Sequence, residues 1–256
     1  MSTALVTGAT AGIGREFAVQ LATQGDDLVL VARDTARLDA LAAELTAAHG
    51  VAVEVISADL SDRTALERVA ERLRDPARPV DLLVNNAGYG LGSAFVDTTV
   101  EDEERLLDVL VRAVLVLSHA AAGAMVARGS GRIINVSSVA GFITSGTYSA
   151  AKSWVTVFTE SLAGQLGPKG VHATVLCPGF VRTEFHERAG IDKGERSGPF
   201  WLDPTDLVAQ ALADSERGRV VSVPSPQYKA LVGVLRHVPR ALLRNPRVTS
   251  AHRKNR

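Results

Sequence analysis

Short runs of apolar, often β-branched residues alternate with longer helical patterns from the start of the chain to about residue 223. Runs that are apolar on both faces and separated by helices indicate a parallel sheet with helices on both sides. The predicted strands are Ala4–Thr7, Leu28–Ala32, Ala52–Ser57, Leu82–Val84, Arg132–Val136, His172–Leu176 and Val220–Val223. The predicted helices include Gly14–Gln24, Ala36–Ala48, Thr64–Leu73, Glu101–Ala127 and Tyr148–Leu166. The pattern predicts one α/β domain with a doubly wound parallel sheet of about seven strands.

The domain is expected to span residues 1–224, followed by a basic, amphipathic tail at 225–256. The least regular stretch inside the domain, residues 183–201, contains three glycines and many charges. A long loop after the sixth strand lies at the carboxyl end of the sheet, where ligands bind in such folds. We therefore expect a mobile substrate flap around 183–201. Asp203-Pro204 then starts another helix, with Asp203 as N-cap and proline in the first turn.

Composition narrows the class of protein. The 256 residues are 46% hydrophobic and 22% charged, which excludes a disordered chain, a collagen-like repeat and a disulfide scaffold. The single cysteine, Cys177, allows no intrachain disulfide and favours a reducing, cytoplasmic setting. Residues 1–216 carry 18 basic and 28 acidic side chains, whereas residues 217–256 carry ten basic and no acidic ones. An acidic main domain argues against nucleic-acid binding.

A glycine-rich loop follows the first predicted strand, with Gly8, Gly12 and Gly14 in the run TGATAGIG (7–14). Glycines there allow a tight turn and close approach of a pyrophosphate to the backbone, and the following helix offers free N–H donors. The spacing is GxxxGxG rather than the general GxGxxG. Because the loop joins a strand to a helix, we expect a dinucleotide site in a Rossmann-type sheet.

The end of the second strand indicates which dinucleotide is preferred. An NAD-specific site has a carboxylate at the strand tip, whereas here Ala32 is followed by Arg33. The Arg33 guanidinium is suited to a 2′-phosphate. Asp34 could approach the ribose or pair with Arg33, but we interpret it as the N-cap of the next helix. These residues favour NADPH over NADH.

Two further motifs follow the next strands. Asp59-Leu60 would lie near an adenine edge, and a capping carboxylate for the next helix is the alternative interpretation of Asp59. Asn85-Asn86-Ala87-Gly88 follows the fourth strand, where small residues let the backbone pass close to a ribose and an asparagine can tie neighbouring strands together.

Three side chains form a candidate catalytic group. Ser138 follows the fifth strand, and Tyr148 and Lys152 stand four residues apart on one helix face. An ammonium stabilises a phenolate, so Lys152 is expected to lower the pKa of Tyr148. A phenol tuned in this way can protonate a carbonyl oxygen or deprotonate an alcohol, while a serine hydroxyl orients the same oxygen.

Across roughly residues 3–224 the chain resembles the short-chain dehydrogenase/reductase family, in its NADP-preferring branch. The matching motifs are TGATAGIG (7–14), Asp59-Leu60, NNAG (85–88), Ser138, YSAAK (148–152) and PGFVRT (178–183). The resemblance implies that Tyr148 is the acid/base, that Ser138 polarises the carbonyl, and that Lys152 binds the nicotinamide ribose. It also implies that Thr183 and the backbone near Val181 hold the carboxamide. The expected cofactor-binding residues are Gly8, Thr10, Gly12, Ile13, Gly14, Arg33, Asp59, Leu60, Asn86, Ala87, Gly88, Tyr148, Lys152, Pro178, Gly179, Val181 and Thr183.

The chain departs from the family pattern at two places. Ser138 and Tyr148 are ten residues apart, closer than is usual in the family, so the loop Val139–Thr147 is shortened beside the substrate. Leu110 stands where the family usually has an asparagine that holds a water of the proton relay. This substitution motivates an alternative hypothesis, a catalytically weak dinucleotide-binding or scaffold protein of the same fold.

The remaining features give weaker expectations. No targeting segment is visible, no metal-ligand spacing is found among the histidines, and Leu106–Ala127 is interpreted as a buried amphipathic helix because it contains charges. In the tail, apolar side chains share one helical face and basic side chains the other. Packing over the substrate cleft or on a second subunit is favoured, and weak contact with an anionic membrane surface is the alternative. The apolar residues are Tyr228, Leu231, Val232, Leu235, Val238 and Leu242.

Taken together, the sequence predicts an NADPH-preferring oxidoreductase that transfers a hydride between nicotinamide and a ketone or secondary alcohol. An apolar substrate, fatty-acyl or steroid-like, is expected from the shortened loop and the tail. We further expect a cytoplasmic homo-oligomer, a dimer or a tetramer, with a small-molecule substrate.

Overall fold

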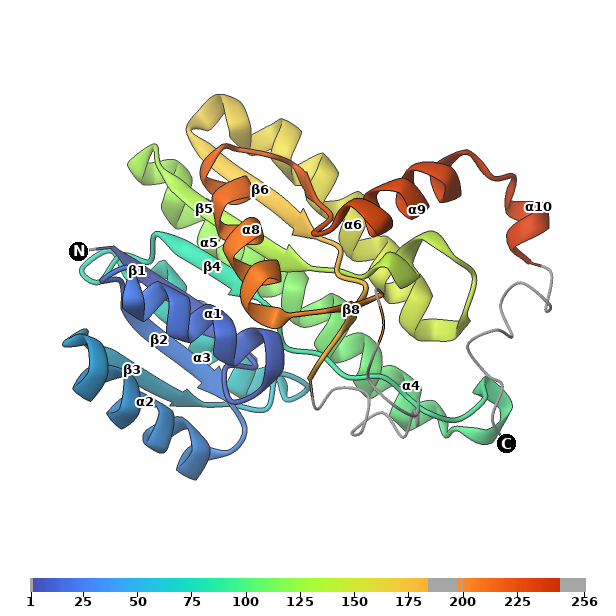
Figure 1. Ribbon diagram of the computed structural model, residues 1–256. Helices are drawn as coiled ribbons and strands as arrows, with labels where there is room; N and C mark the ends of the chain where they lie inside the picture. Colours follow the sequence, from blue (N-terminus) through green and yellow to red (C-terminus); the bar gives the residue numbers. More distant parts are fainter. Residues whose placement is uncertain (1, 184–197, 199, 245–256) are drawn as a thin grey trace.

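Seven parallel strands form one sheet in the order β3-β2-β1-β4-β5-β6-β9 (Figure 1). The computed structural model describes residues 2–183, 198 and 200–244. The strands of this sheet are β1 (Thr3–Thr7), β2 (Asp27–Ala32), β3 (Val53–Ser57), β4 (Leu82–Asn85), β5 (Gly131–Val136), β6 (Val171–Leu176) and β9 (Val221–Ser222). The predicted doubly wound α/β fold is confirmed, and each predicted strand lies within two residues of an observed one.

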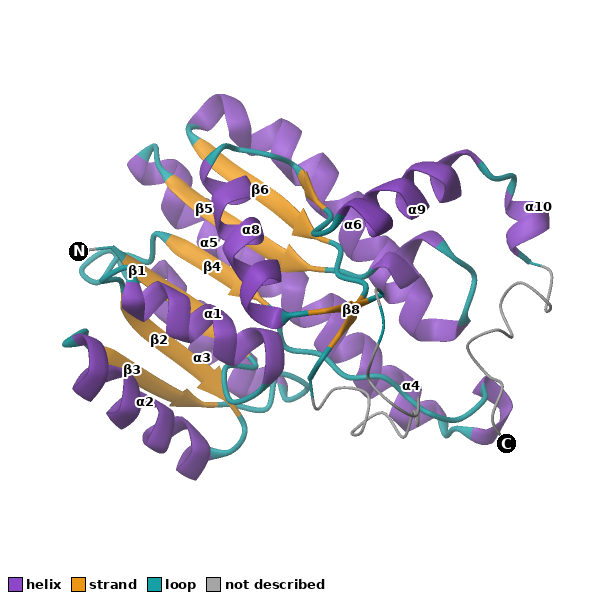
Figure 2. Cartoon of the chain, in the orientation of Figure 1, coloured by secondary structure: helices purple, strands orange, loops and turns teal. Residues whose placement is uncertain are grey.

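Helices cover both faces of the sheet (Figure 2). The helices of the described residues are α1 (Gly12–Thr23), α2 (Thr35–His49), α3 (Arg63–Arg74), α4 (Val100–Leu107), α5 (Ala113–Arg128), α6 (Gly146–Leu166), α8 (Pro204–Glu216), α9 (Pro226–His237) and α10 (Arg240–Leu243). Helices α1, α2 and α8 share one apolar core with the sheet, which includes Phe17 and Leu207. Helices α3 and α5 share a second core, which includes Leu66 and Leu117. The inner strands β1, β2, β4, β5 and β6 are therefore mostly buried, as their continuous apolar runs predicted, whereas no residue of the edge strand β3 is fully buried.

The order of the strands places the ligand crevice. Strand β1 pairs with β2 on one side and with β4 on the other. The connections after β1 and after β4 lead to opposite halves of the sheet, to β2 and to β5, so their loops separate at the carboxyl ends of β1 and β4. A crevice at such a switch point is where ligands bind in open α/β sheets.

A second, two-stranded sheet consists of β7 (Phe180–Val181) and β8 (Trp201–Leu202), which run parallel. The sequence did not predict it, since both strands are only two residues long and pair across a long gap in the chain. Most of the expected flap, residues 184–197 and 199, lies outside the described residues. Helix α8 begins as predicted, because Asp203 accepts a hydrogen bond from the Thr205 amide at 2.8 Å and Pro204 follows in the first turn.

The helical stretch from Val100 to Arg128 is long and apolar enough to cross a membrane by length and composition alone. Half of its most apolar window is buried inside the molecule, which is the environment of a core helix. The predicted single helix is interrupted by a π-helical segment at Asp108–Arg112, between α4 and α5. A π segment adds one residue to a single helical turn, and the sequence analysis did not predict this interruption.

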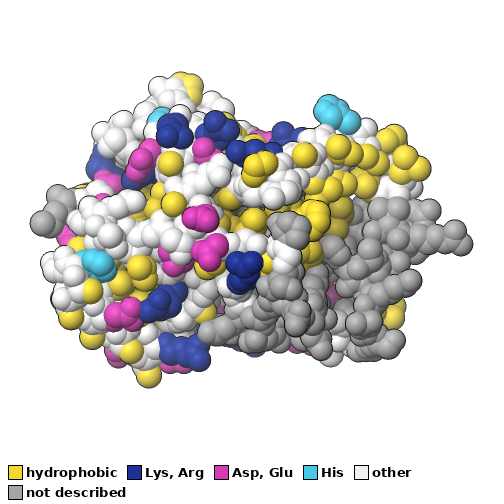
Figure 3. Space-filling view, in the orientation of Figure 1, with side chains coloured by type: hydrophobic (Ala, Val, Ile, Leu, Met, Phe, Trp, Pro, Cys, Tyr) yellow, Lys and Arg dark blue, Asp and Glu magenta, His cyan; other side chains and the backbone are white. Residues whose placement is uncertain are grey.

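The first tail helix, α9, packs on the domain. Tyr228 and Val232 are buried in a core cluster together with Val155 of α6 and Cys177. Leu231 and Leu242, expected on the same packed face, are instead 40% and 61% exposed. Hydrophobic side chains gather on the surface over α9 (Figure 3).

Candidate active site

In the glycine-rich loop after β1, backbone segments lie too close together for side chains to fit between them. A side chain on Gly14 would place its Cβ 2.2 Å from the Gly8 carbonyl oxygen, so only glycine fits there. Gly12 has a φ of +52°, a left-handed conformation that glycine adopts without steric cost. These two positions explain two of the three glycines that the sequence analysis singled out.

The N-terminus of α1 is left without a side-chain cap. Ala11 at the N-cap accepts no side-chain hydrogen bond, and the first turn contains no acidic residue. The first amides of a helix need partners, and an anion supplies them. Thr183 lies against the same loop, since a Cβ on Gly12 would be 3.1 Å from the Thr183 side chain. The loop thus fits a pyrophosphate, and the expected carboxamide-binding residue lies beside it.

The NNAG run is tied to the first strand. The Thr7 hydroxyl accepts hydrogen bonds from the amides of Asn86 and Ala87, at 2.9 and 3.0 Å. The Asn86 side chain donates to the Thr7 carbonyl at 2.9 Å. Asn85 is buried and donates to Asn135 of β5 at 2.8 Å. The expectation that an asparagine ties neighbouring strands together is confirmed, and the run is joined to both β1 and β5.

Arg33 and Asp34 have separate environments. The Asp34 carboxylate accepts from the Arg37 amide at 3.1 Å as the N-cap of α2 and lies 3.6 Å from the Arg37 guanidinium. The cap interpretation is therefore confirmed, and Asp34 does not pair with Arg33. The Arg33 side chain is exposed and makes no hydrogen bond or ion pair with any other described residue. Its guanidinium is therefore exposed at the carboxyl end of β2.

Asp59 contacts an arginine that sequence reasoning missed. Its carboxylate accepts from the Ser61 amide and hydroxyl, and Arg105 of α4 donates to it at 2.7 Å. These hydrogen bonds lower the pKa of Asp59 although partial burial opposes them. The alternative of Asp59 as a helix cap was wrong, because Asp62 caps α3 by accepting from the Ala65 amide.

The three catalytic candidates come together. Tyr148 and Ser138 hydrogen-bond through their hydroxyls, and the Lys152 ammonium lies 5.8 Å from the centre of the Tyr148 ring. Lys152 is buried and donates to the Val136 carbonyl at 2.7 Å. Ser138 also accepts from the Ala140 amide at 3.1 Å, which fixes the start of the shortened loop. Two hydroxyls therefore converge on one point beside a buried cation.

The pKa values in this group are dominated by burial. Burial raises the pKa of Tyr148 to about 12, against the lowering effect of its hydrogen bond with Ser138. Burial also lowers the pKa of Lys152 to about 8. Contrary to expectation, the pKa of Tyr148 therefore does not lie below its usual value, because burial disfavours the phenolate more strongly than the neighbouring Ser138 favours it.

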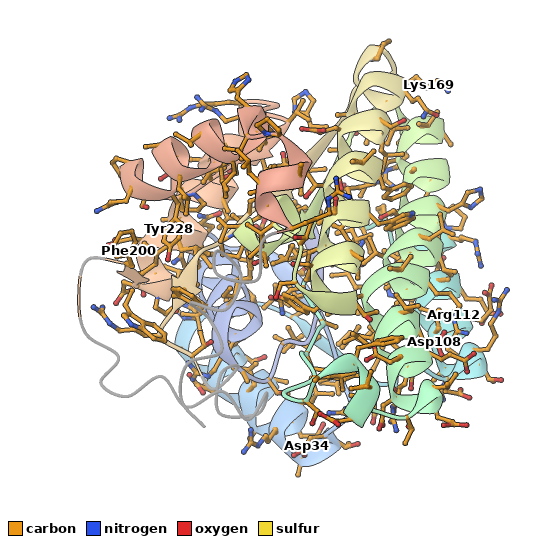
Figure 4. The ribbon with its side chains drawn as sticks, turned by 90° about the vertical axis from the view of Figure 1, so that its right-hand side faces the viewer. Asp34, Asp108, Arg112, Lys169, Phe200 and Tyr228 are labelled. Carbon is orange, nitrogen blue, oxygen red and sulfur yellow. The ribbon has the colours of Figure 1, made fainter. Side chains whose placement is uncertain are left out.

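Leu110 lies beside the catalytic lysine. It is completely buried inside the π-helical segment and belongs to a small core cluster with Leu106 and Ala151, against which Tyr148 packs. A Cβ on Gly88 would be 2.8 Å from Leu110 Cδ2 and 3.7 Å from Lys152 Nζ. Asp108 and Arg112, one turn apart in Figure 4, form an ion pair at 2.8 Å across the segment.

The other expected site residues line the same edge of the sheet. The Pro178 carbonyl accepts from the Val139 amide at 3.0 Å, which joins the loop after β6 to the shortened loop after Ser138. Val181 and Leu60 are buried, while Thr10 and Ile13 are half-buried in the glycine loop. Within the described part of the chain, no three His, Cys, Asp or Glu side chains are grouped as a metal site.

The fold and this site define a class: a dinucleotide-binding oxidoreductase with a Ser-Tyr-Lys group. A family model described as short chain dehydrogenase matches residues 2–194. The chain belongs to the short-chain dehydrogenase/reductase family, whose members act on CH–OH and C=O groups.

Three known proteins illustrate the relationship. An uncharacterized oxidoreductase from Staphylococcus epidermidis is 34% identical over 223 residues, covering 86% of this chain and 94% of the relative. The structure of a short-chain dehydrogenase from Sphingobium yanoikuyae in complex with NADPH is 38% identical, with a TM-score of 0.84 over 94% of this chain and 98% of that one. A bulky-bulky ketone specific alcohol dehydrogenase from Comamonas testosteroni is 32% identical, with a TM-score of 0.79 over 94% and 96%.

The geometry accounts for carbonyl chemistry at this site. When bound in the crevice, a nicotinamide dinucleotide supplies or accepts the hydride. The Ser138 and Tyr148 hydroxyls can both donate to one carbonyl oxygen, and Tyr148 passes its proton to that oxygen during reduction. The phenolate that remains is stabilised by the nearby Lys152 cation. In the oxidative direction the same phenolate takes the alcohol proton.

Proposed function

We propose that this protein is an NADPH-preferring oxidoreductase that interconverts an apolar ketone and its secondary alcohol. The observation that carries the proposal is the convergence of the Ser138 and Tyr148 hydroxyls beside Lys152, at the same sheet edge as the glycine loop. The exposed guanidinium of Arg33, which makes no hydrogen bond or ion pair with other described residues, supports the preference for a 2′-phosphate. The similarity to a relative that binds NADPH supports it as well.

Arg33→Ala should weaken NADPH binding roughly tenfold or more, since a hydrogen bond to a charged group contributes about 1.5–3 kcal/mol. NADH lacks the 2′-phosphate, so its affinity should not change. Calorimetric titration of wild type and variant with both cofactors measures this. Arg74→Ala is the matched control, because Arg74 is an arginine of α3 that pairs with Glu67. Equal affinities of the wild type for NADH and NADPH would contradict the assignment.

The substrate class is proposed to be ketones with large apolar groups on both sides of the carbonyl. The similarity to a bulky-bulky ketone specific dehydrogenase supports this, and so does the shortened loop between Ser138 and Tyr148. A groove of about 850 Å³ lies next to that loop, and Phe142, Ile143 and Leu243 are among its lining residues. Fatty-acyl and steroid-like ketones belong to this class. A panel of aliphatic, diaryl and steroid ketones assayed for NADPH oxidation tests it.

Tyr148→Phe should abolish turnover while NADPH binding is retained, because the substitution removes the hydroxyl that transfers the proton and keeps the aromatic ring. We expect at least about a hundredfold loss of kcat, within the range of general acid catalysis. Turnover is measured with the best ketone of the panel, and cofactor binding by calorimetry. Near-wild-type turnover would contradict the role of Tyr148, whereas loss of NADPH binding as well would point to a damaged fold.

We also propose that the protein is a cytoplasmic homo-oligomer that makes weak contact with membrane surfaces. The single cysteine supports the reducing compartment. Exposed aliphatic side chains on the outer faces of α5 and α6, Leu115 and Val157, support contact with a second copy. Sedimentation velocity distinguishes a monomer from a dimer or a tetramer. The membrane contact concerns the tail and is tested separately.

A further inference from the structure

Tyr228 of α9 joins three segments that are far apart in the sequence. Its hydroxyl accepts a hydrogen bond from the Phe180 amide at 3.0 Å and donates one to the Phe200 carbonyl at 2.8 Å. The rings of Phe200 and Tyr228 meet edge to face at 6.1 Å and lie next to one another in Figure 4. One phenol oxygen thus links β7, the residue before β8, and helix α9.

The ring of Tyr228 occupies the space that a side chain at position 179 would need. A Cβ on Gly179 would lie 2.0 Å from the Tyr228 ring. Tyr228 is only 2% exposed, and burial raises its pKa, so the hydroxyl keeps the proton that it donates to Phe200. The absence of a side chain at position 179 therefore leaves room for the Tyr228 ring, which belongs to a helix that begins 47 residues later.

The start of α9 is strained in a way that brings Tyr228 into place. Ser225 has a φ of +98° and is the only described non-glycine residue with a positive φ. Its side chain caps the helix by accepting from the Tyr228 amide at 3.3 Å. Such strain persists where surrounding contacts determine the conformation.

A series of contacts connects Tyr228 with the glycine-rich loop after β1. Phe180 and Val181 form β7, and β7 pairs with β8. The Arg182 amide then donates to the Leu202 carbonyl at 3.1 Å, which extends the pairing to the residue before Thr183. Thr183 in turn lies against Gly12 at the start of α1. A shift of Phe180 would therefore move Thr183 relative to the glycine loop.

We propose that Tyr228 is a positioning residue: its hydroxyl and ring hold the segment from Gly179 to Thr183 in the place where it contacts the nicotinamide end of the cofactor. The effect on the cofactor rests on the proposed function, whereas the effect on the segment itself does not. Helix α9 thereby acts on cofactor binding through β7 and Thr183.

The test compares Tyr228→Phe with Val232→Ala. The first variant removes the hydroxyl and keeps the ring. The second removes buried methyl groups from the same helix and the same core cluster but leaves the Tyr228 hydroxyl and its two hydrogen bonds in place. Two quantities are measured below the unfolding temperature of each variant: amide hydrogen exchange at Phe180, and NADPH affinity by calorimetry.

In Tyr228→Phe we expect roughly three- to tenfold faster exchange at Phe180 and NADPH binding weaker by a similar factor, the fold-change for loss of a neutral hydrogen bond. Val232→Ala should lower the melting temperature but leave both quantities within twofold of wild type. Gly179→Ala should weaken NADPH binding more in the wild-type background than in Tyr228→Ala, where the ring is absent.

Three results would overturn the positioning role of Tyr228. Unchanged exchange at Phe180 in Tyr228→Phe, faster exchange with unchanged NADPH affinity, or equal effects of Val232→Ala would overturn it. A wild-type protein that binds no NADPH would refute the proposed function instead. The proposal would then stand or fall on Phe180 exchange and on the binding of whichever dinucleotide the protein takes.

Discussion

At the scale of single residues, the chemistry depends on a buried lysine. Lys152 donates to a backbone carbonyl and lies against Tyr148, Gly88 and Leu110, with little water to solvate its charge. Its pKa is lowered to about 8, from the usual 10.5. The ammonium therefore carries its charge below pH 8 and loses it as the pH rises through that value.

This titration predicts the pH profile of ketone reduction. Tyr148, with a pKa raised to about 12, stays protonated throughout the physiological range, so the proton is always present. Its donation needs the Lys152 cation to stabilise the phenolate. We expect kcat/KM for reduction to be flat below pH 8 and to fall above it, measured from pH 6 to 9.5 with saturating NADPH.

Lys152→Arg provides the control, since arginine stays charged over the whole range. The variant should have lower activity, because a guanidinium cannot reproduce the lysine geometry, but its profile should show no fall near pH 8. A wild-type profile that rises with pH above 8 would contradict the assignment. It would mean that the lysine acts in its neutral form or that another group limits the rate.

At the scale of elements, the π-helical segment between α4 and α5 carries the main departure from the family. Short π segments inside helices often accompany functional sites. Here the segment directs Leu110 toward Gly88 and Lys152, where the family usually has an asparagine. Leucine offers no hydrogen bond, so a water at that place would need other partners.

Leu110→Asn should change turnover by less than about tenfold, a barrier shift under ~1.4 kcal/mol, because Ser138, Tyr148 and Lys152 are all in place. The melting temperature should fall, since a polar group replaces a fully buried leucine. Leu106→Asn, one turn earlier in the same cluster, controls for this destabilisation. A gain in turnover well above tenfold, specific to position 110, would show that proton supply limits the natural enzyme.

The elements also show what the sequence can predict. The main sheet and the helices that cover it follow from apolar runs, capping residues and glycine turns, which are local signals. Asp203 and Asp34 cap helices as predicted. The glycine loop and the Ser-Tyr-Lys group were found because their spacing is set by a single strand end or a single helix face.

The rest depends on contacts between distant segments. Arg105 and Asp59 are 46 residues apart in the sequence, and Tyr228 and Phe180 are 48 apart. No local sequence pattern predicts either pair. The short pairing of β7 with β8 is of the same kind. A tyrosine in an otherwise aliphatic stripe was the one available sign for Tyr228, because a buried phenol needs hydrogen-bond partners.

At the scale of the whole molecule, charge is divided unevenly along the chain. Residues 217–256 contain ten basic and no acidic side chains, while the rest of the chain is acidic. Over α9 and α10 the surface shows aliphatic side chains, with Leu231, Val234 and Leu242 between 40% and 62% exposed (Figure 3). Exposed aliphatic groups beside basic ones match an anionic lipid surface.

The match predicts weak, salt-sensitive binding of the intact chain to vesicles. Each basic side chain near an anionic surface contributes about 1 kcal/mol, and salt screens this attraction. We expect the protein to pellet with phosphatidylserine-containing vesicles at low salt. It should not pellet with them at about 0.5 M salt, where the Debye length is only a few ångströms. It should not pellet with neutral vesicles at either salt concentration. Leu231→Ser combined with Val234→Ser should reduce pelleting, because both side chains are exposed and their loss leaves the buried face of α9 intact. Absence of pelleting on anionic vesicles at low salt would remove the membrane contact and leave a second protein copy as the occupant of this surface.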